Sequence, residues 1–213
     1  MNTDDLVSLL AKSAGPVESD TVTRRFAIAL GWGMFGSTLA MAITLGVRPD
    51  ISDVLLLPMF WVKLMFPALV AIIALYAAIR LAQPGVRLGR APAMLGALAA
   101  VVWALGMFAL LNAAPAERRS MIFGDTWMDC LVGVPLLSIP VFIAAVWAMK
   151  GLAPTRLRLA GGAAGLLAGA VSATVYALHC PELEVPFIAI WYVIGMSIPA
   201  VAGALIGHRL LRW

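Results

Sequence analysis

The sequence predicts an all-α protein, a polytopic membrane bundle of six transmembrane helices with a short N-terminal cytoplasmic amphipathic helix. Of its 213 residues, 62% are hydrophobic and only 12% are charged, and the mean hydropathy is +0.97. The apolar residues fall in runs of about twenty, the length of a helix that crosses a hydrocarbon core of ~30 Å. A soluble domain of this size could not bury so much apolar surface.

The predicted spans divide the chain into a cytoplasmic tail, 1–25, and a transmembrane domain, 26–213. The tail carries several acidic residues, whereas a cleaved signal peptide would begin with a short basic region, so we expect the first span to remain. Lys63 is the charged residue within a span, and we expect it to extend toward the lipid headgroups. The six spans are Phe26–Gly46, Met59–Ile79, Ala93–Leu111, Leu131–Met149, Leu159–Leu178 and Pro186–Gly207.

The basic residues predict the orientation. With the N-terminus inside, eleven of the fifteen Lys and Arg residues fall on the cytoplasmic side, and Arg48, Lys63, Arg118 and Arg119 fall outside. The positive-inside rule favours this arrangement, and an even number of spans places both termini in the cytoplasm. The net charge of +4 is then explained by topology and attraction to membrane lipid, without direct nucleic-acid binding.

The first residues predict one short amphipathic helix. Thr3 is a suitable N-cap, and Asp4 and Asp5 follow where the helix dipole favours acids. Leu6, Leu9 and Leu10 share one face. A helix this short is marginal alone, so its apolar face needs a partner. A protein groove, the lipid surface and the chain's own bundle are the alternatives, and the acidic polar face favours a protein groove.

Two cysteines, Cys130 and Cys180, begin the fourth span and follow the fifth. A short basic turn connects those spans, so both cysteines are expected at the outer membrane face. Three interpretations remain open: a structural disulfide, two inert apolar residues, or a metal- or oxidant-sensing site. His179, Asp129 and Glu182 could complete such a site. No cofactor is firmly implied, beyond a possible transient heavy-metal ion at Cys130 and Cys180.

Small residues recur at intervals of four within the last two spans and allow helix backbones to approach closely. Packing within one chain is favoured over homodimerisation, and the oligomeric state stays open. The residues are Gly161, Gly165 and Gly169 in the fifth span and Gly195, Pro199, Gly203 and Gly207 in the sixth.

The sequence lacks the signatures of hydrolases and nucleotide-binding enzymes, and we expect no enzymatic activity. A membrane thiol-disulfide redox protein and a small multi-pass transporter are the competing classes. The first would need cysteines in close pairs. The second would be expected to carry ionisable groups within its spans.

Several motifs together resemble the NrsF-like family, whose name means negative regulator of sigma F. They are the opening TDDLVSLLA…PV, the pair Arg24-Arg25, Gly46-Val-Arg-Pro-Asp50, YALHCPE at Tyr176–Glu182, Trp191-Tyr192 and the terminal HRLLRW. The resemblance covers the whole chain. It implies a six-helix anti-sigma factor of the bacterial inner membrane, which holds an extracytoplasmic-function sigma factor inactive and releases it on an external stress signal.

The resemblance also implies roles for residues. The tail becomes the sigma-binding element, with Asp4, Asp5, Leu6, Leu9, Leu10, Pro16 and Val17 as its contact residues. Cys130 and Cys180 match the cysteines that the family associates with a response to heavy metals or oxidants.

Overall fold

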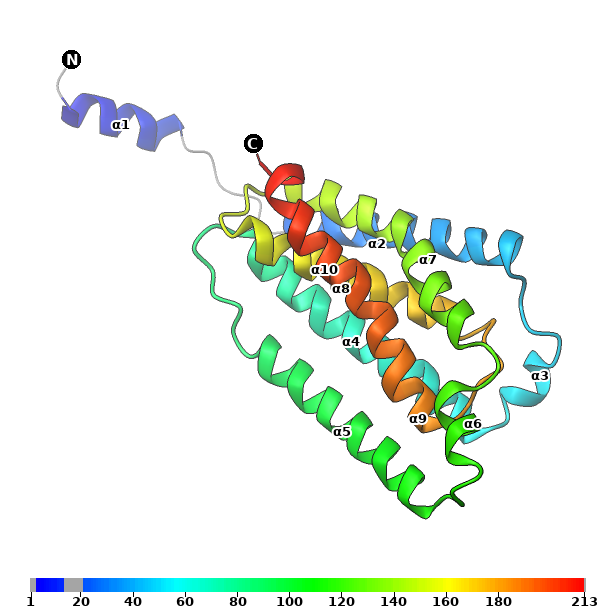
Figure 1. Ribbon diagram of the computed structural model, residues 1–213. Helices are drawn as coiled ribbons and strands as arrows, with labels where there is room; N and C mark the ends of the chain where they lie inside the picture. The colour runs from blue at the N-terminus through cyan, green and yellow to red at the C-terminus, as the bar shows by residue number, and fades with distance from the viewer. Residues whose placement is uncertain (1–2, 14–20, 213) are drawn as a thin grey trace.

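The computed structural model describes residues 3–13 and 21–212, and within these residues every regular element is a helix (Figure 1). The side chains of residues 10–13 are not described. The elements are α1 (Thr3–Ser13), α2 (Thr21–Thr44), α3 (Ile51–Val54), α4 (Pro58–Ala82), α5 (Ala91–Asn112), α6 (Arg118–Phe123), α7 (Trp127–Lys150), α8 (Leu157–Tyr176), α9 (Val185–Phe187), the π-helix η1 (Ile188–Tyr192) and α10 (Val193–Leu210).

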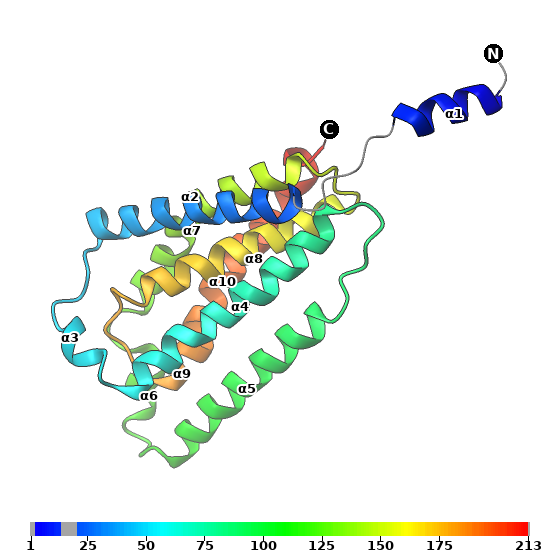
Figure 2. The same ribbon diagram turned by 180° about the vertical axis from the view of Figure 1, so that it is seen from behind.

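The prediction of six long apolar helices is confirmed. Helices α2, α4, α5 and α8, the stretch 118–150 containing α6 and α7, and the stretch from α9 to α10 are each long and apolar enough to cross a membrane. Their boundaries agree with the predicted spans to within a few residues. The successive helices alternate in direction. We call the end that holds the start of α2 and the end of α10 the terminal end. The opposite end, with the connections 45–57, 113–126 and 177–184, is the loop end (Figures 1 and 2).

Helix α8 lies at the centre and is the most buried of the six. It packs against α10, α4, α7 and α2. The glycines of α8 and α10 face each other. A Cβ on Gly161 would overlap the backbone of Gly203 and Gly207, and one on Gly165 would overlap the Pro199 carbonyl. These close approaches lie within one chain, so they account for the spacing without a second copy.

The remaining glycines of the two stripes also lie in contact. Gly169 faces the Met196 carbonyl, and Gly195 faces Val134 of α7. Ser172 of α8 donates a hydrogen bond to the Val134 carbonyl at 2.9 Å, so α7 and α8 are also joined by a buried polar contact.

Helix α5 is the least buried of the long helices. It contacts α4, α9 and η1, and both views show it separated from α8 and α10 along much of its length (Figures 1 and 2).

Helix α1 lies outside the bundle in both views (Figures 1 and 2). Asp4 and Asp5 occupy its first turn, and the side chains of Leu6 and Leu9 are 42% and 60% exposed. Pro16 and Val17 lie outside the described residues, as does the side chain of Leu10.

The glycine contacts generate a stability prediction. Alanine is the better helix former by about 1 kcal/mol, yet Gly165→Ala should lower the stability by about 1–3 kcal/mol because its methyl group forces α8 away from α10. Thermal unfolding in detergent measures the effect. Gly96→Ala in α5, where a Cβ would meet nothing within 4 Å, is the matched control and should leave the midpoint unchanged or raise it. Equal midpoints for the two variants would contradict the close packing.

Candidate functional site

The segment 177–184 joins the end of α8 to α9 and is the meeting point of the loop end. It contains the sequence His179-Cys180-Pro181-Glu182. Because the segment is not helical, several of its backbone carbonyls have no intrahelical donor and need partners elsewhere. Those partners come from α4 and the connection after α2.

Lys63 of α4 is completely buried. Its Nζ donates hydrogen bonds to the carbonyl oxygens of Cys180 at 2.6 Å and Glu182 at 2.7 Å. The ammonium also lies 5.8 Å from the centre of the Tyr192 ring, within reach of a cation–π contact. The prediction that Lys63 extends toward headgroups is therefore wrong. The carbonyls of the 177–184 segment that have no helical donor accept hydrogen bonds from the Lys63 ammonium inside the protein. The Lys63 side chain therefore need not reach the membrane surface.

Arg48 holds the same segment from the other side. Its Nη1 donates to the carbonyls of Cys180 at 3.2 Å and Pro181 at 3.4 Å, and its backbone N–H donates to Leu178 O at 3.3 Å. The rest of the guanidinium binds both carboxylate oxygens of Asp50 at 2.7 Å. This fixes the Arg48 side chain as a bidentate fork.

The same ion pair shifts the ionisation of both partners. The hydrogen bonds from Arg48 lower the pKa of Asp50, and those to Asp50 raise the pKa of Arg48. Because the pKa of Asp50 is lowered on folding, the pair stabilises the fold fully above about pH 4, the ordinary aspartate range. That contribution is lost as the pH falls through the folded pKa.

His179 and Glu182 are both engaged in holding other loops. His179 Nδ1 lies 2.9 Å from the Gly46 carbonyl, which can only accept, so Nδ1 carries the proton. A Glu182 carboxylate oxygen accepts from the Asp125 N–H at 2.8 Å and the Thr126 hydroxyl at 3.4 Å. Gly124 has φ +52°, and a Cβ there would overlap this carboxylate, so the turn before α7 needs a glycine.

The structure therefore does not assemble the predicted coordination shell. Asp129 is exposed in the first turn of α7, whereas the His179 and Glu182 side chains bind the Gly46 carbonyl and the Asp125–Thr126 backbone and hydroxyl. Within the described part of the chain, no group of three or more His, Cys, Asp or Glu residues could hold a metal ion.

Cys130 and Cys180 are free thiols and are completely buried. They pack in one hydrophobic cluster with the buried side chains of Tyr176 and Tyr192. External chemistry therefore does not reach them directly in this conformation. A buried thiol in apolar surroundings reacts slowly, because reaction needs access and thiolate. The packing around each cysteine must open before that cysteine can react, and for Cys180 this means the 177–184 segment that contains it.

A family model described as "Negative regulator of sigma F" matches residues 10–213. The chain belongs to the NrsF family. It is 52% identical over its full length, and over the full length of the relative, to the "Probable anti-sigma-F factor NrsF" of Azospira oryzae. It is 36% identical, again over the whole of both chains, to the "Anti-sigma-F factor NrsF" of Caulobacter vibrioides. No solved structure matches it significantly.

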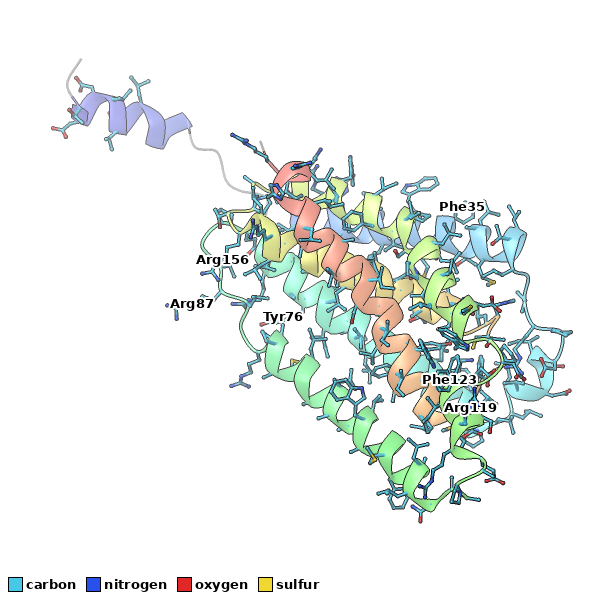
Figure 3. The ribbon with its side chains drawn as sticks, viewed as in Figure 1. Phe35, Tyr76, Arg87, Arg119, Phe123 and Arg156 are labelled. Carbon is cyan, nitrogen blue, oxygen red and sulfur yellow. The ribbon has the colours of Figure 1, made fainter. Side chains whose placement is uncertain are left out.

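The sequence analysis did not predict that two cations, Lys63 and Arg48, hold the 177–184 segment. A lysine inside an apolar span is a signal in itself, because such a charge is costly unless it has internal partners. The π-helix η1 was also missed. This π-helix forms one turn of the last span. It contains Tyr192, whose ring lies near Lys63, and Trp191, whose Nε1 donates a hydrogen bond to Ile122 O at 2.8 Å. Figure 3 shows this end of the bundle, with Phe123 and Arg119 of α6.

Thiol labelling tests the burial. With a hydrophilic maleimide in mild detergent, Cys130 and Cys180 should react at least about tenfold more slowly than after unfolding in dodecyl sulfate. A cysteine at the exposed position 120 of α6, made by Ser120→Cys, should react rapidly in the folded protein. Rapid labelling of both native cysteines in the folded protein would contradict their burial.

Removing Lys63 should expose the thiol of Cys180. Lys63→Met leaves the Glu182 carbonyl without its donor and the Cys180 carbonyl with Arg48 alone, at a cost of about 1–3 kcal/mol, and each 1.4 kcal/mol is a factor of ten in the open population. Labelling of Cys180 should therefore accelerate by about tenfold or more. Lys150→Met, at the exposed end of α7, removes the same charge and should not change the rate. Equal rates in the two variants would show that Lys63 does not hold the segment closed.

Proposed function

We propose that this chain is an anti-sigma factor of the bacterial inner membrane. It holds an extracytoplasmic-function sigma factor inactive at the cytoplasmic face and releases it on an external metal or oxidant signal sensed near Cys130 and Cys180. The observation that carries the proposal is the match, over the full length of both chains, to relatives named as anti-sigma-F factors. Those relatives are named as regulators, which favours this role over the redox enzyme and the transporter.

The distribution of charge supports the proposed orientation, with both termini cytoplasmic. Between residues 21 and 212, ten Lys and Arg residues belong to the terminal end and four to the loop end. All seven acidic residues in that range belong to the loop end. A bundle with a basic end and an acidic end fits a membrane whose cytoplasmic side retains the positive charge. We assign residues 1–25 to a cytoplasmic partner-binding tail and 26–213 to the transmembrane domain.

The tail is the proposed sigma-binding element. Leu6 and Leu9 are exposed on α1, and an exposed apolar stripe on a short helix fits the groove of a partner protein. Asp4 and Asp5 in the first turn suit a partner with basic residues around that groove. Leu10, Pro16 and Val17 complete the proposed contact set.

The cysteine pair is the proposed sensor, and its burial sets how it would act. A soft metal ion would displace the two thiol protons as it binds, or an oxidant would take up two electrons and two protons as a disulfide forms. Either change at Cys180 moves the peptide whose carbonyl accepts hydrogen bonds from Lys63 and Arg48. Helix α8 begins at the terminal end and reaches this segment as one continuous helix, so it can transmit the movement toward the tail.

The tail proposal predicts loss of partner capture. Burying a leucine side chain is worth about 1.5–3 kcal/mol, so Leu6→Asp with Leu9→Asp should weaken binding by about a hundredfold or more. The sigma factor that copurifies with the detergent-solubilised chain measures this. Ser8→Asp adds one negative charge on α1 away from the face that Leu6 and Leu9 share and should retain the partner. If both proteins retain it equally, the binding surface lies elsewhere.

The sensor proposal predicts loss of induction. Cys130→Ser and Cys180→Ser should each abolish most of the response of a sigma-dependent reporter to soft metals or oxidants, with repression intact. The double variant should match either single one, because the pair acts as a unit. Met128→Ser alters an exposed sulfur beside the same turn and should respond normally. A normal response from the double variant would make the pair structural.

A further inference from the structure

An apolar groove of about 320 Å³ lies where α4, α5, α8 and α10 meet. Volumes of this order hold small ligands. About half of its lining residues are alanine or glycine, including Ala77 of α4, Gly162 of α8 and Ala204 of α10, and Leu95 lines it from α5. The groove exists because these residues leave room and because α5 does not close onto α8 and α10.

The groove differs from two other apolar pockets in having a charged residue among those that line it. Arg158, in the first turn of α8 at the terminal end, belongs to its lining. The pocket between α2, α4 and α8, which includes Ala68, is about 230 Å³, and the one between α5 and α9–η1 is about 310 Å³. Neither of these two is lined by a charged residue.

Further basic residues lie close in sequence to a lining residue of the groove. Leu88 lines it and stands between the exposed side chains of Arg87 and Arg90. Figure 3 shows Arg87 and Arg156 at the terminal end of the bundle. The terminal end of the described bundle holds no acidic residue that could neutralise these cations. An anion is the ligand that this charge distribution favours.

We propose that this groove binds an anionic phospholipid, with one acyl chain along the apolar walls and the phosphate on Arg158. The proposal rests on the membrane placement in the proposed function. An arginine guanidinium binds a phosphate through paired N–H donors, and the small residues admit a flexible hydrocarbon chain. A helix from a second copy is about 10–12 Å across with its side chains, too wide for a groove of this volume.

Native mass spectrometry of the full chain in a nonionic detergent tests the site. With dioleoyl phosphatidylglycerol or dioleoyl phosphatidylcholine added at equal concentration, the phosphatidylglycerol adduct should be at least about fivefold more abundant. Arg158→Gln should remove most of this preference, and Arg158→Lys should restore part of it. Arg209→Gln removes an exposed charge at the same end, outside the lining, and should leave the preference unchanged.

A second pair of variants tests the apolar part. Ala204→Phe places a ring in the groove and should reduce the adduct at least about fivefold. Ala68→Phe fills the neutral pocket beside α2 and should not. Thermal unfolding identifies any variant that fails to fold, and for a misfolded Ala204→Phe the Arg158 series decides. Equal binding of the two lipids, equal effects of Arg158→Gln and Arg209→Gln, or a dimer that Ala204→Phe disrupts would overturn the proposal.

Capture of the sigma factor, measured on the same preparations, separates the two proposals. If the wild type captures its partner but shows no preference for phosphatidylglycerol, the lipid site is wrong and the proposed function stands. If it prefers phosphatidylglycerol but captures no sigma factor, the proposed function is wrong and the lipid site stands.

Discussion

The loop end of the molecule depends on one buried charge. Burying an ammonium is costly unless it is fully hydrogen-bonded, and Lys63 meets this demand through the carbonyls of Cys180 and Glu182. The carbonyls need the ammonium in turn, because they lack helical hydrogen-bond donors where α8 ends. The 177–184 segment therefore has one arrangement that satisfies both sides. Arg48 adds hydrogen bonds to the same peptides, and Glu182 extends the network to the turn before α7.

The long helices could be predicted from the sequence because the thickness of the hydrocarbon core sets the length of the apolar run that crosses it. The sequence also predicted close helix contacts at Gly161 and Gly203, since spacing by four places small residues on one face. It could not predict Lys63. A lysine a few residues inside a span can reach either the membrane surface or an internal carbonyl. Which of the two it reaches depends on where a helix ends more than a hundred residues away in the sequence. The predicted coordination shell was wrong for the same reason. His179 and Glu182 bind backbone and hydroxyl groups in segments that are distant in sequence.

The burial of the cysteines changes how a sensor at this place would work. An exposed thiol pair would respond at the rate of its own chemistry. Buried thiols would respond through the fraction of time that their surroundings are open, and Lys63 and Arg48 hold the segment that contains Cys180. Helix α8 ends at that segment, and its glycine contacts with α10 make it a closely packed rod. In the proposed mechanism, α8 is the element that would carry a change from the loop end to the terminal end.

Hydrogen exchange of the full chain, bound to its sigma factor in detergent, tests this account most directly. The amides to follow are those of Arg48 and Asp125, which donate to Leu178 O and Glu182 respectively. Adding a thiol-specific oxidant should increase exchange in the peptides containing both amides, with the same time course as release of the sigma factor. Release while both peptides remain protected would contradict the account.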